Sequence, residues 1–279
     1  MRAPPTREGY TVDGAGAAAL RLAGAVTVVT GGGSGIGAAL ARRFAERGAV
    51  VVVNDLDTDA ARGVAERVGG VALSGDAGDP AAVGQLVATV WERYGGIDLF
   101  CANAGVAADE ATGDPDAAWE LSWRVNVMAH VYAARALLPR WLAAGRGRLL
   151  VTASAAGLLT MLGGAPYAVT KHAAIGYAEW LRATYHHRGI TVQALCPQGV
   201  RTPMLDRAGR AGALLEEGAI GAEEVADRVE EALAGDRFLV LPHAEVAEHY
   251  RRRATDPDRW LRAMNGIQRS LESSDQGTT

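Results

Sequence analysis

Three polar side chains, Ser154, Tyr167 and Lys171, have the types and the spacing that a proton-transfer site needs. Tyr167 and Lys171 are four residues apart, so on a helix they lie on one face, one turn apart. A nearby cation stabilises a phenolate, which lets the tyrosine pass a proton near neutral pH. Ser154 follows an apolar run, and we expect its hydroxyl to hydrogen-bond the same substrate oxygen.

Lys171 is the only lysine in the 279 residues, and every other basic side chain among the 28 is an arginine. A planar guanidinium does not replace a compact ammonium where a point charge is required. The alternative interpretation is a surface lysine beside a core tyrosine. The single use of lysine at this position favours a chemical role.

A glycine-rich loop, which reads Thr30-Gly-Gly-Gly-Ser-Gly-Ile-Gly37, stands between a predicted strand and a predicted helix. Glycines in this place allow a tight turn and let a pyrophosphate approach the backbone at a helix N-terminus. The spacing is Gly-x-x-x-Gly-x-Gly, which differs from the usual six-residue dinucleotide fingerprint. The predicted cofactor contacts in this loop are Gly31, Ser34, Gly35, Ile36 and Gly37.

Acidic residues follow the next two predicted strands. Asp55 can accept hydrogen bonds from a ribose diol and repels a 2′-phosphate, and Leu56 beside it supplies no compensating cation. NAD(H) is therefore predicted in preference to NADP(H), although Asp55 could instead cap a helix. Asp76 and Ala77 could meet the adenine, or Asp76 could serve a turn.

The order of apolar and amphipathic segments predicts an α/β fold of the doubly wound Rossmann type, with a parallel seven-stranded sheet and helices on both faces. The candidate residues come at strand ends, where such folds bind ligands. The predicted strands are 25–30, 49–54, 71–74, 97–101, 147–153, 190–196 and 237–241. The predicted helices are 35–47, 58–68, 80–94, 116–144 with a bend or break at Pro139, 166–187 and 222–234.

Composition changes divide the chain into a flexible N-terminal arm (1–24), a Rossmann-type dinucleotide-binding and catalytic domain (25–241), a C-terminal helical extension (242–271) and a disordered tail (272–279). A long connection over 199–218 is a candidate lid.

The charge of −4 and the pI of about 5.9 argue against a nucleic-acid or anionic-membrane partner. The sequence contains no secretory signal and no apolar run long enough to span a membrane. Cys101 and Cys196 are interpreted as small buried hydrophobes, so neither a disulfide nor a metal site is predicted. A cytoplasmic location is expected.

From about Ala25 to Leu241 the chain resembles the single-domain subgroup of the short-chain dehydrogenase/reductase family. The resemblance rests on the glycine loop, Asp76, Asn103-Ala104-Gly105, Asn126, Ser154, Tyr167-x-x-x-Lys171 and the segment from Pro197 to Thr202. It implies that Tyr167 is the general acid/base, that Ser154 positions the substrate oxygen, and that Lys171 lowers the tyrosine pKa and holds the nicotinamide ribose. It also implies that Asn126 helps to hold a water, that Asn103, Ala104 and Gly105 line the cofactor and brace the central strands, and that Pro197, Val200 and Thr202 meet the carboxamide.

Gln198 is a departure, because the family commonly has glycine after this proline. It could touch substrate or only reshape the turn. Leu158 and Met204, with their apolar neighbours, are expected to line a cleft for a hydrophobic small molecule, unless they pack against the long connection.

The predicted function is therefore NAD(H)-dependent oxidation of an apolar secondary alcohol, or the reverse reduction. The alternatives are a 3-oxoacyl thioester reductase and a non-catalytic dinucleotide-sensing protein. Long helices with apolar residues around much of their circumference, together with the resemblance, predict a homotetramer.

Overall fold

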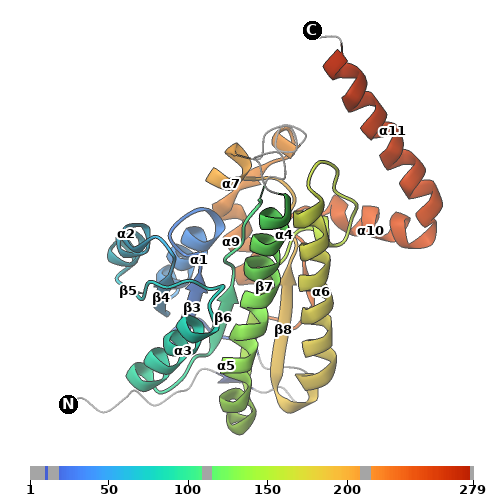
Figure 1. Cartoon of the computed structure of the whole chain (residues 1–279). Coiled ribbons are helices and arrows are strands. Elements are labelled where there is room, and N and C mark those ends of the chain that lie inside the picture. The colour runs from blue at the N-terminus through green and yellow to red at the C-terminus, as the bar shows by residue number, and fades with distance from the viewer. Residues whose placement is uncertain (1–9, 12–18, 109–114, 208–214, 277–279) are drawn as a thin grey trace.

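A sheet of seven parallel strands runs through the centre of the computed structural model, which describes residues 10–11, 19–108, 115–207 and 215–276 (Figure 1). The strand order is β11-β8-β7-β6-β3-β4-β5. The strands are β3 (Val26–Thr30), β4 (Val50–Asn54), β5 (Val71–Ala72), β6 (Leu99–Ala102), β7 (Gly147–Thr152), β8 (Ile190–Leu195) and β11 (Leu239–Val240). The predicted doubly wound α/β fold is confirmed.

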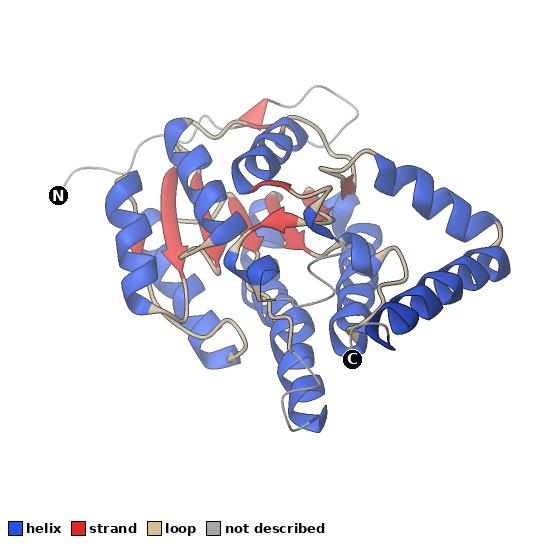
Figure 2. Cartoon of the chain, turned by 90° about the horizontal axis from the view of Figure 1, so that it is seen from above, coloured by secondary structure: helices blue, strands red, loops and turns tan. Residues whose placement is uncertain are grey.

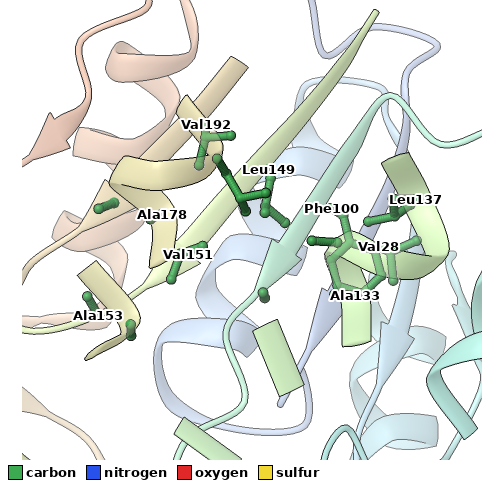
Figure 3. Close-up of a cluster of buried hydrophobic side chains, with 14 of the residues drawn as sticks. Val28, Phe100, Ala133, Leu137, Leu149, Val151, Ala153, Ala178 and Val192 are labelled. Atoms are coloured by element: carbon green, nitrogen blue, oxygen red, sulfur yellow. The ribbon is translucent and has the colours of Figure 1, made fainter. Parts of the chain in front are cut away.

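Helices cover both faces of the sheet, and each face has its own hydrophobic core (Figure 2). Residues of α3 (Pro80–Tyr94), α5 (Ala129–Ala144) and α6 (Ala165–Tyr185) share one core with the strands, part of which Figure 3 shows around Phe100 and Leu149. Residues of α1 (Gly35–Glu46), α2 (Thr58–Val68) and α9 (Ala222–Leu233) share the other. Because both faces are covered, the central strands are buried along their whole length, which explains their valine-rich sequence.

The long helical region does not break where the sequence predicted. α4 (Pro115–Trp123) passes into a single π-helical turn at Arg124–Met128 before α5 begins, whereas Pro139 lies inside α5. Such turns occur mostly at functional sites. The turn here contains Asn126, whose side-chain amide is bonded outside its own helix.

Short elements fill the segments outside the central fold. The predicted arm contains β1 (Tyr10–Thr11) and β2 (Ala19–Leu20), and Leu20 and Leu22 are buried against one core, so its last residues are packed. The long connection contains β9 (Val200–Arg201) and α7 (Pro203–Asp206), and β9 pairs with β10 (Ile220–Gly221). The rest of the arm and residues 208–214 lie outside the described residues.

The C-terminal extension forms two helices, α10 (Glu245–Thr255) and α11 (Pro257–Gln276). The tail predicted to be disordered from residue 272 is helical up to Gln276, and residues 277–279 lie outside the description. Of the helices described, none combines the length and the apolar character that a membrane crossing requires.

His130, on α5 one turn after Asn126, is a buried polar group with an energetic consequence. Its side chain is 1% exposed, and neither ring nitrogen has a hydrogen-bond partner among the described residues. Burial, assisted by the charge of Lys171, lowers the pKa of His130 to about 3. The folded protein therefore holds this imidazole neutral.

Replacing His130 should make the protein less sensitive to acid. Between about pH 6.5 and pH 3 the unfolded chain binds a proton at this position and the folded chain does not. The free energy of unfolding therefore decreases by about 1.4 kcal/mol for each unit by which the pH is lowered in this range. Urea unfolding at several pH values should show a shallower acid loss for His130→Gln. The exposed control His187→Gln should keep the wild-type slope, and equal slopes in both variants would contradict the assignment.

Candidate active site

The carboxyl ends of the parallel strands open into a cavity of about 850 Å³. Its wall includes every residue that the sequence predicted to bind the cofactor, together with Ser154, Gln198 and Met204. Of the predicted residues, only Asn126 and Leu158 do not line it. Parallel strands place these residues together, because all of their ends point to one edge of the sheet.

The glycine loop forms one end of the cavity at the start of α1. Gly31 has a φ of +61°, and a Cβ there would lie 2.9 Å from Ala104 Cα. A Cβ on Gly37 would lie 2.1 Å from the Gly31 carbonyl oxygen. No side chain caps α1 at Ser34 and no acidic residue stands in its first turn, so its N-terminal N–H groups remain available to an anion.

Asp55 supports this loop from the end of β4. Its Oδ2 accepts a hydrogen bond of 2.9 Å from the Gly33 N–H, and its Oδ1 accepts one of 3.0 Å from the Asp57 N–H. The N-cap of α2 is Asp57, which accepts bonds from two N–H groups of the first turn. The alternative role of Asp55 as a helix cap is therefore wrong.

Asp76 is held in a turn after β5. It accepts a 2.7 Å hydrogen bond from the Gly78 N–H and forms an ion pair with Arg124, a cavity residue that the sequence analysis missed. Partial burial disfavours the charged carboxylate, but these two partners lower the pKa of Asp76 overall. Asp76 thus serves the turn and also faces the cavity beside Ala77.

The Asn103 amide connects the strands on either side of β6. Its Nδ2 donates to the carbonyls of Thr30 and Gly31, at 3.0 and 3.3 Å. Its Oδ1 accepts a 3.0 Å bond from the Thr152 hydroxyl on β7. One side chain therefore holds the glycine loop against the end of β7, the strand that precedes Ser154.

Ser154, Tyr167 and Lys171 line the same cavity. Ser154 follows β7, and its hydroxyl accepts a 3.1 Å bond from the Ala156 N–H and donates to the Pro197 carbonyl at 3.4 Å. Tyr167 and Lys171 lie in the first two turns of α6, with the ammonium 5.5 Å from the phenol ring centre. Lys171 is 3% exposed and donates a 2.9 Å bond to the Thr152 carbonyl.

Burial controls the protonation of this group. It lowers the pKa of Lys171 to about 8, so the amine exchanges its proton near neutral pH. It raises the pKa of Tyr167, and the Ser154 hydroxyl opposes this shift only in part. The direction is opposite to the lowering expected from the Tyr-x-x-x-Lys spacing, because burial outweighs the favourable contacts.

Asn126 lies behind the cavity wall and is fully buried. Its amide exchanges hydrogen bonds of 2.9 Å with the N–H and carbonyl of Val106, and donates to the Thr170 hydroxyl at 3.1 Å. A Cβ on Gly105 would lie 3.3 Å from both Asn126 Oδ1 and Lys171 Nζ. Asn126 therefore joins the segment after β6 to the helix that carries Tyr167.

Leu158 is a correction. It was predicted to line the substrate cleft, but its side chain is 2% exposed and belongs to the core against α6. A short 3₁₀ turn at Ala155–Gly157 directs it inward. The next four residues, Leu159, Thr160, Met161 and Leu162, line the cavity instead. Three further lining residues were missed by the sequence analysis: Leu215, and Met264 and Ile267 of α11. The apolar stripe of the C-terminal extension was visible in the sequence, but its position was not.

The segment after β8 lies across the middle of the cavity. The Gln198 N–H donates to His243 Nδ1 at 3.2 Å, which fixes the backbone, while the residue lines the cavity. Pro197, Val200 and Thr202 also line it. Gln198 therefore both belongs to a fixed turn and faces the site.

One cavity therefore holds groups for proton transfer and groups for anion binding. The oxygen of an alcohol or ketone bound near Ser154 would lie beside a phenol and a buried amine. Among the residues that the structure describes, no group of three or more His, Cys, Asp or Glu side chains is placed to hold a metal ion.

Known proteins share this architecture. The sequence profile of the short chain dehydrogenases matches residues 25–212. The 1-deoxy-11-beta-hydroxypentalenate dehydrogenase of Streptomyces exfoliatus is 39% identical over 232 residues, 78% of this chain and 83% of that protein. The 2,5-dichloro-2,5-cyclohexadiene-1,4-diol dehydrogenase LinX of Sphingobium indicum is 33% identical, over 66% of this chain and 76% of its own length.

The crystal structure of a short chain dehydrogenase/reductase from Burkholderia phymatum in complex with NAD has a TM-score of 0.79 and 27% identity, and covers 86% of this chain and 96% of that one. A polyketide ketoreductase solved with NADPH has a TM-score of 0.69 and 27% identity, over 75% of this chain and 90% of its own. The match over most of the chain, with the site geometry above, shows that this protein belongs to the short-chain dehydrogenase/reductase family.

Proposed function

We propose that the protein is an NAD(H)-dependent oxidoreductase that interconverts an apolar secondary alcohol and its ketone. The observation that carries the proposal is that Ser154, Tyr167 and Lys171 line the same cavity as an uncapped, glycine-rich helix N-terminus. Proton transfer and anion binding are thus placed in one continuous site.

The residues present fit a dinucleotide. The free N–H groups at the start of α1 suit its pyrophosphate, and Asp55 at the end of β4 suits a ribose diol. A Cβ at Gly31 or Gly37 would collide with the Ala104 backbone or with the Gly31 carbonyl oxygen, which explains why both positions are glycine. A bound dinucleotide would supply the hydride chemistry of the reaction.

The chain's own residues handle the proton. In the oxidation direction the ionised form of Tyr167 would accept the alcohol proton at its Oη as the hydride leaves the carbon, so the products would be a ketone, a reduced cofactor and the proton that Tyr167 released on ionising. Ser154 holds the substrate oxygen in place. Lys171, with its pKa near 8, supplies a cation beside the phenol that can itself exchange a proton. Asn126 keeps the elements around Lys171 together.

An apolar substrate is supported by the lining beyond Ser154. Leu159, Met161 and Leu162 come from one side and Met204 and Leu205 from the other. The names of the two relatives above describe hydroxylated or diol substrates. A cytoplasmic location remains a prediction from the sequence.

The 3-oxoacyl thioester reductase is the second candidate, favoured by the structural likeness to a ketoreductase bound to NADPH. Arginines near the site would be needed to attract an acyl carrier. Arg124 and Arg207 line the cavity, but Arg124 is paired with Asp76, and Arg207 donates to the Pro203 carbonyl. A non-catalytic sensing role would not require the three polar residues, all of which are in place.

Removing the Tyr167 hydroxyl should abolish most turnover without removing cofactor binding. We expect Tyr167→Phe to lower kcat by about 10²–10⁴-fold, the usual contribution of a positioned acid/base. NADH binding, followed by its fluorescence, should stay within a few-fold of wild type. Near-normal kcat for a panel of secondary alcohols would show that another group carries the proton.

Asp55 should make the enzyme prefer NAD(H). Repulsion between a carboxylate and a 2′-phosphate at close range costs about 1–4 kcal/mol, so kcat/KM with NADP should be lower by about 5-fold to 10³-fold. Asp55→Asn keeps an acceptor for the Gly33 N–H and removes the charge, so it should reduce the difference in kcat/KM between NAD and NADP. Equal use of both cofactors by the wild-type enzyme would rule out the assignment.

The surface of α4 and α6 supports a homotetramer. Trp119, Trp123, Val169 and Trp180 are exposed large apolar side chains on these two contacting helices. Exposed apolar groups of this size mark protein interfaces. Light scattering should return about four times the 29.1 kDa chain mass, and Trp180→Glu should reduce it. A monomer at micromolar concentration would reject the proposal.

A further inference from the structure

The C-terminal extension is anchored at its base and open beyond it. In α10, Val246 is fully buried and Arg253 donates to the Leu158 carbonyl. In α11, Trp260 packs against the core and donates a 3.0 Å bond to the Thr160 hydroxyl. After this first turn α11 stands away from the body of the molecule (Figure 1). None of its side chains that the structure describes is buried.

α11 nevertheless carries an apolar stripe. Trp260, Met264, Ile267 and Leu271 follow one another at intervals of four, three and four residues, so they share one face of the helix. Met264 and Ile267 line the same cavity as Tyr167. Two residues of the stripe therefore face the cavity, and the bond from Trp260 to Thr160 places its base beside the segment that follows Ser154. Leu261 is also apolar and exposed, but it lies about 100° around the helix and does not line the cavity.

The residues across from this stripe are apolar as well. Met161 and Leu162 follow the anchoring Thr160, and Met204 and Leu205 belong to α7. Met204 and Ile267 are 37% and 46% exposed, so apolar surface on both sides of the mouth remains in water. A small alcohol held at Ser154 and Tyr167 would leave these surfaces wet, whereas a larger apolar ligand would cover them.

We propose that α11 is the outer wall of the substrate site, and that Met264 and Ile267 select for secondary alcohols whose apolar body is larger than a single six-membered ring. The inference rests on the proposed function and names its substrate class. The anchors at Trp260 and Arg253 fix the position of the wall, and the stripe beyond them supplies contacts that only a large substrate reaches.

A pair of alcohols that differ in size tests this wall. Cyclohexanol and cyclododecanol would be compared by kcat/KM with NAD for the wild type and for Met264→Ser, Ile267→Ser and Leu261→Ser. Leu261 is 53% exposed, close to Ile267, so it is a matched control on the same helix. We expect the cyclododecanol-to-cyclohexanol ratio to fall at least about tenfold in the first two variants. Leu261→Ser should keep the wild-type ratio within about twofold.

Failure of the wall and failure of the proposed function give different results. If the wild type oxidises cyclohexanol but Met264→Ser and Ile267→Ser leave the ratio unchanged, the wall is overturned and the function stands. The wall is also overturned if kcat/KM falls equally for both alcohols, or if Leu261→Ser lowers the cyclododecanol-to-cyclohexanol ratio as much as the other two variants do.

If neither alcohol is oxidised, that result counts against the proposed function. The role of α11 as a wall is then tested by a binding measurement. The fluorescent apolar anion 1-anilinonaphthalene-8-sulfonate should then bind more weakly to Met264→Ser and Ile267→Ser than to the wild type and Leu261→Ser. Equal binding to all four proteins overturns the wall.

Discussion

The hydrogen bonds of the Asn103 side chain hold the two halves of the site in register. One amide reaches the Thr30 and Gly31 carbonyls on one side and the Thr152 hydroxyl on the other. The Thr152 carbonyl in turn accepts from the buried Lys171 ammonium. A polar group in this position must be fully bonded, because an unpaired buried amide costs about 1–3 kcal/mol. The glycine loop, the catalytic strand and the lysine therefore share one connected set of bonds.

Much of this architecture could be predicted from the sequence, because it depends on patterns with one physical meaning. Valine-rich runs buried on both faces must be central strands of a covered parallel sheet, and residues that follow such strands must gather at one edge. The spacing of Tyr167 and Lys171 likewise needs only the pitch of a helix. All the predicted loop and strand-end residues accordingly line one cavity.

The predictions failed where the outcome depends on packing that no local pattern records. Pro139 was expected to bend or break its helix, but α5 does not break there, and the irregular turn lies around Asn126, whose amide is occupied by Val106 and Thr170 from other elements. Leu158 looked like its apolar neighbours, but a 3₁₀ turn directs it into the core. The pKa of Tyr167 is raised because burial, which the four-residue spacing does not reveal, outweighs its polar partners.

The burial of Lys171 gives the folded chain an unusual chemical surface. Its solvent-facing cations are guanidinium groups, and the one side-chain amine is 3% exposed with its nitrogen bonded to the Thr152 carbonyl. Reagents that acylate amines therefore meet almost no side-chain target on the closed molecule. Because Lys171 lines the cavity, a reagent reaches it through the site, and the rate of its modification measures how accessible that cavity is. A single native residue thus reports access to the site.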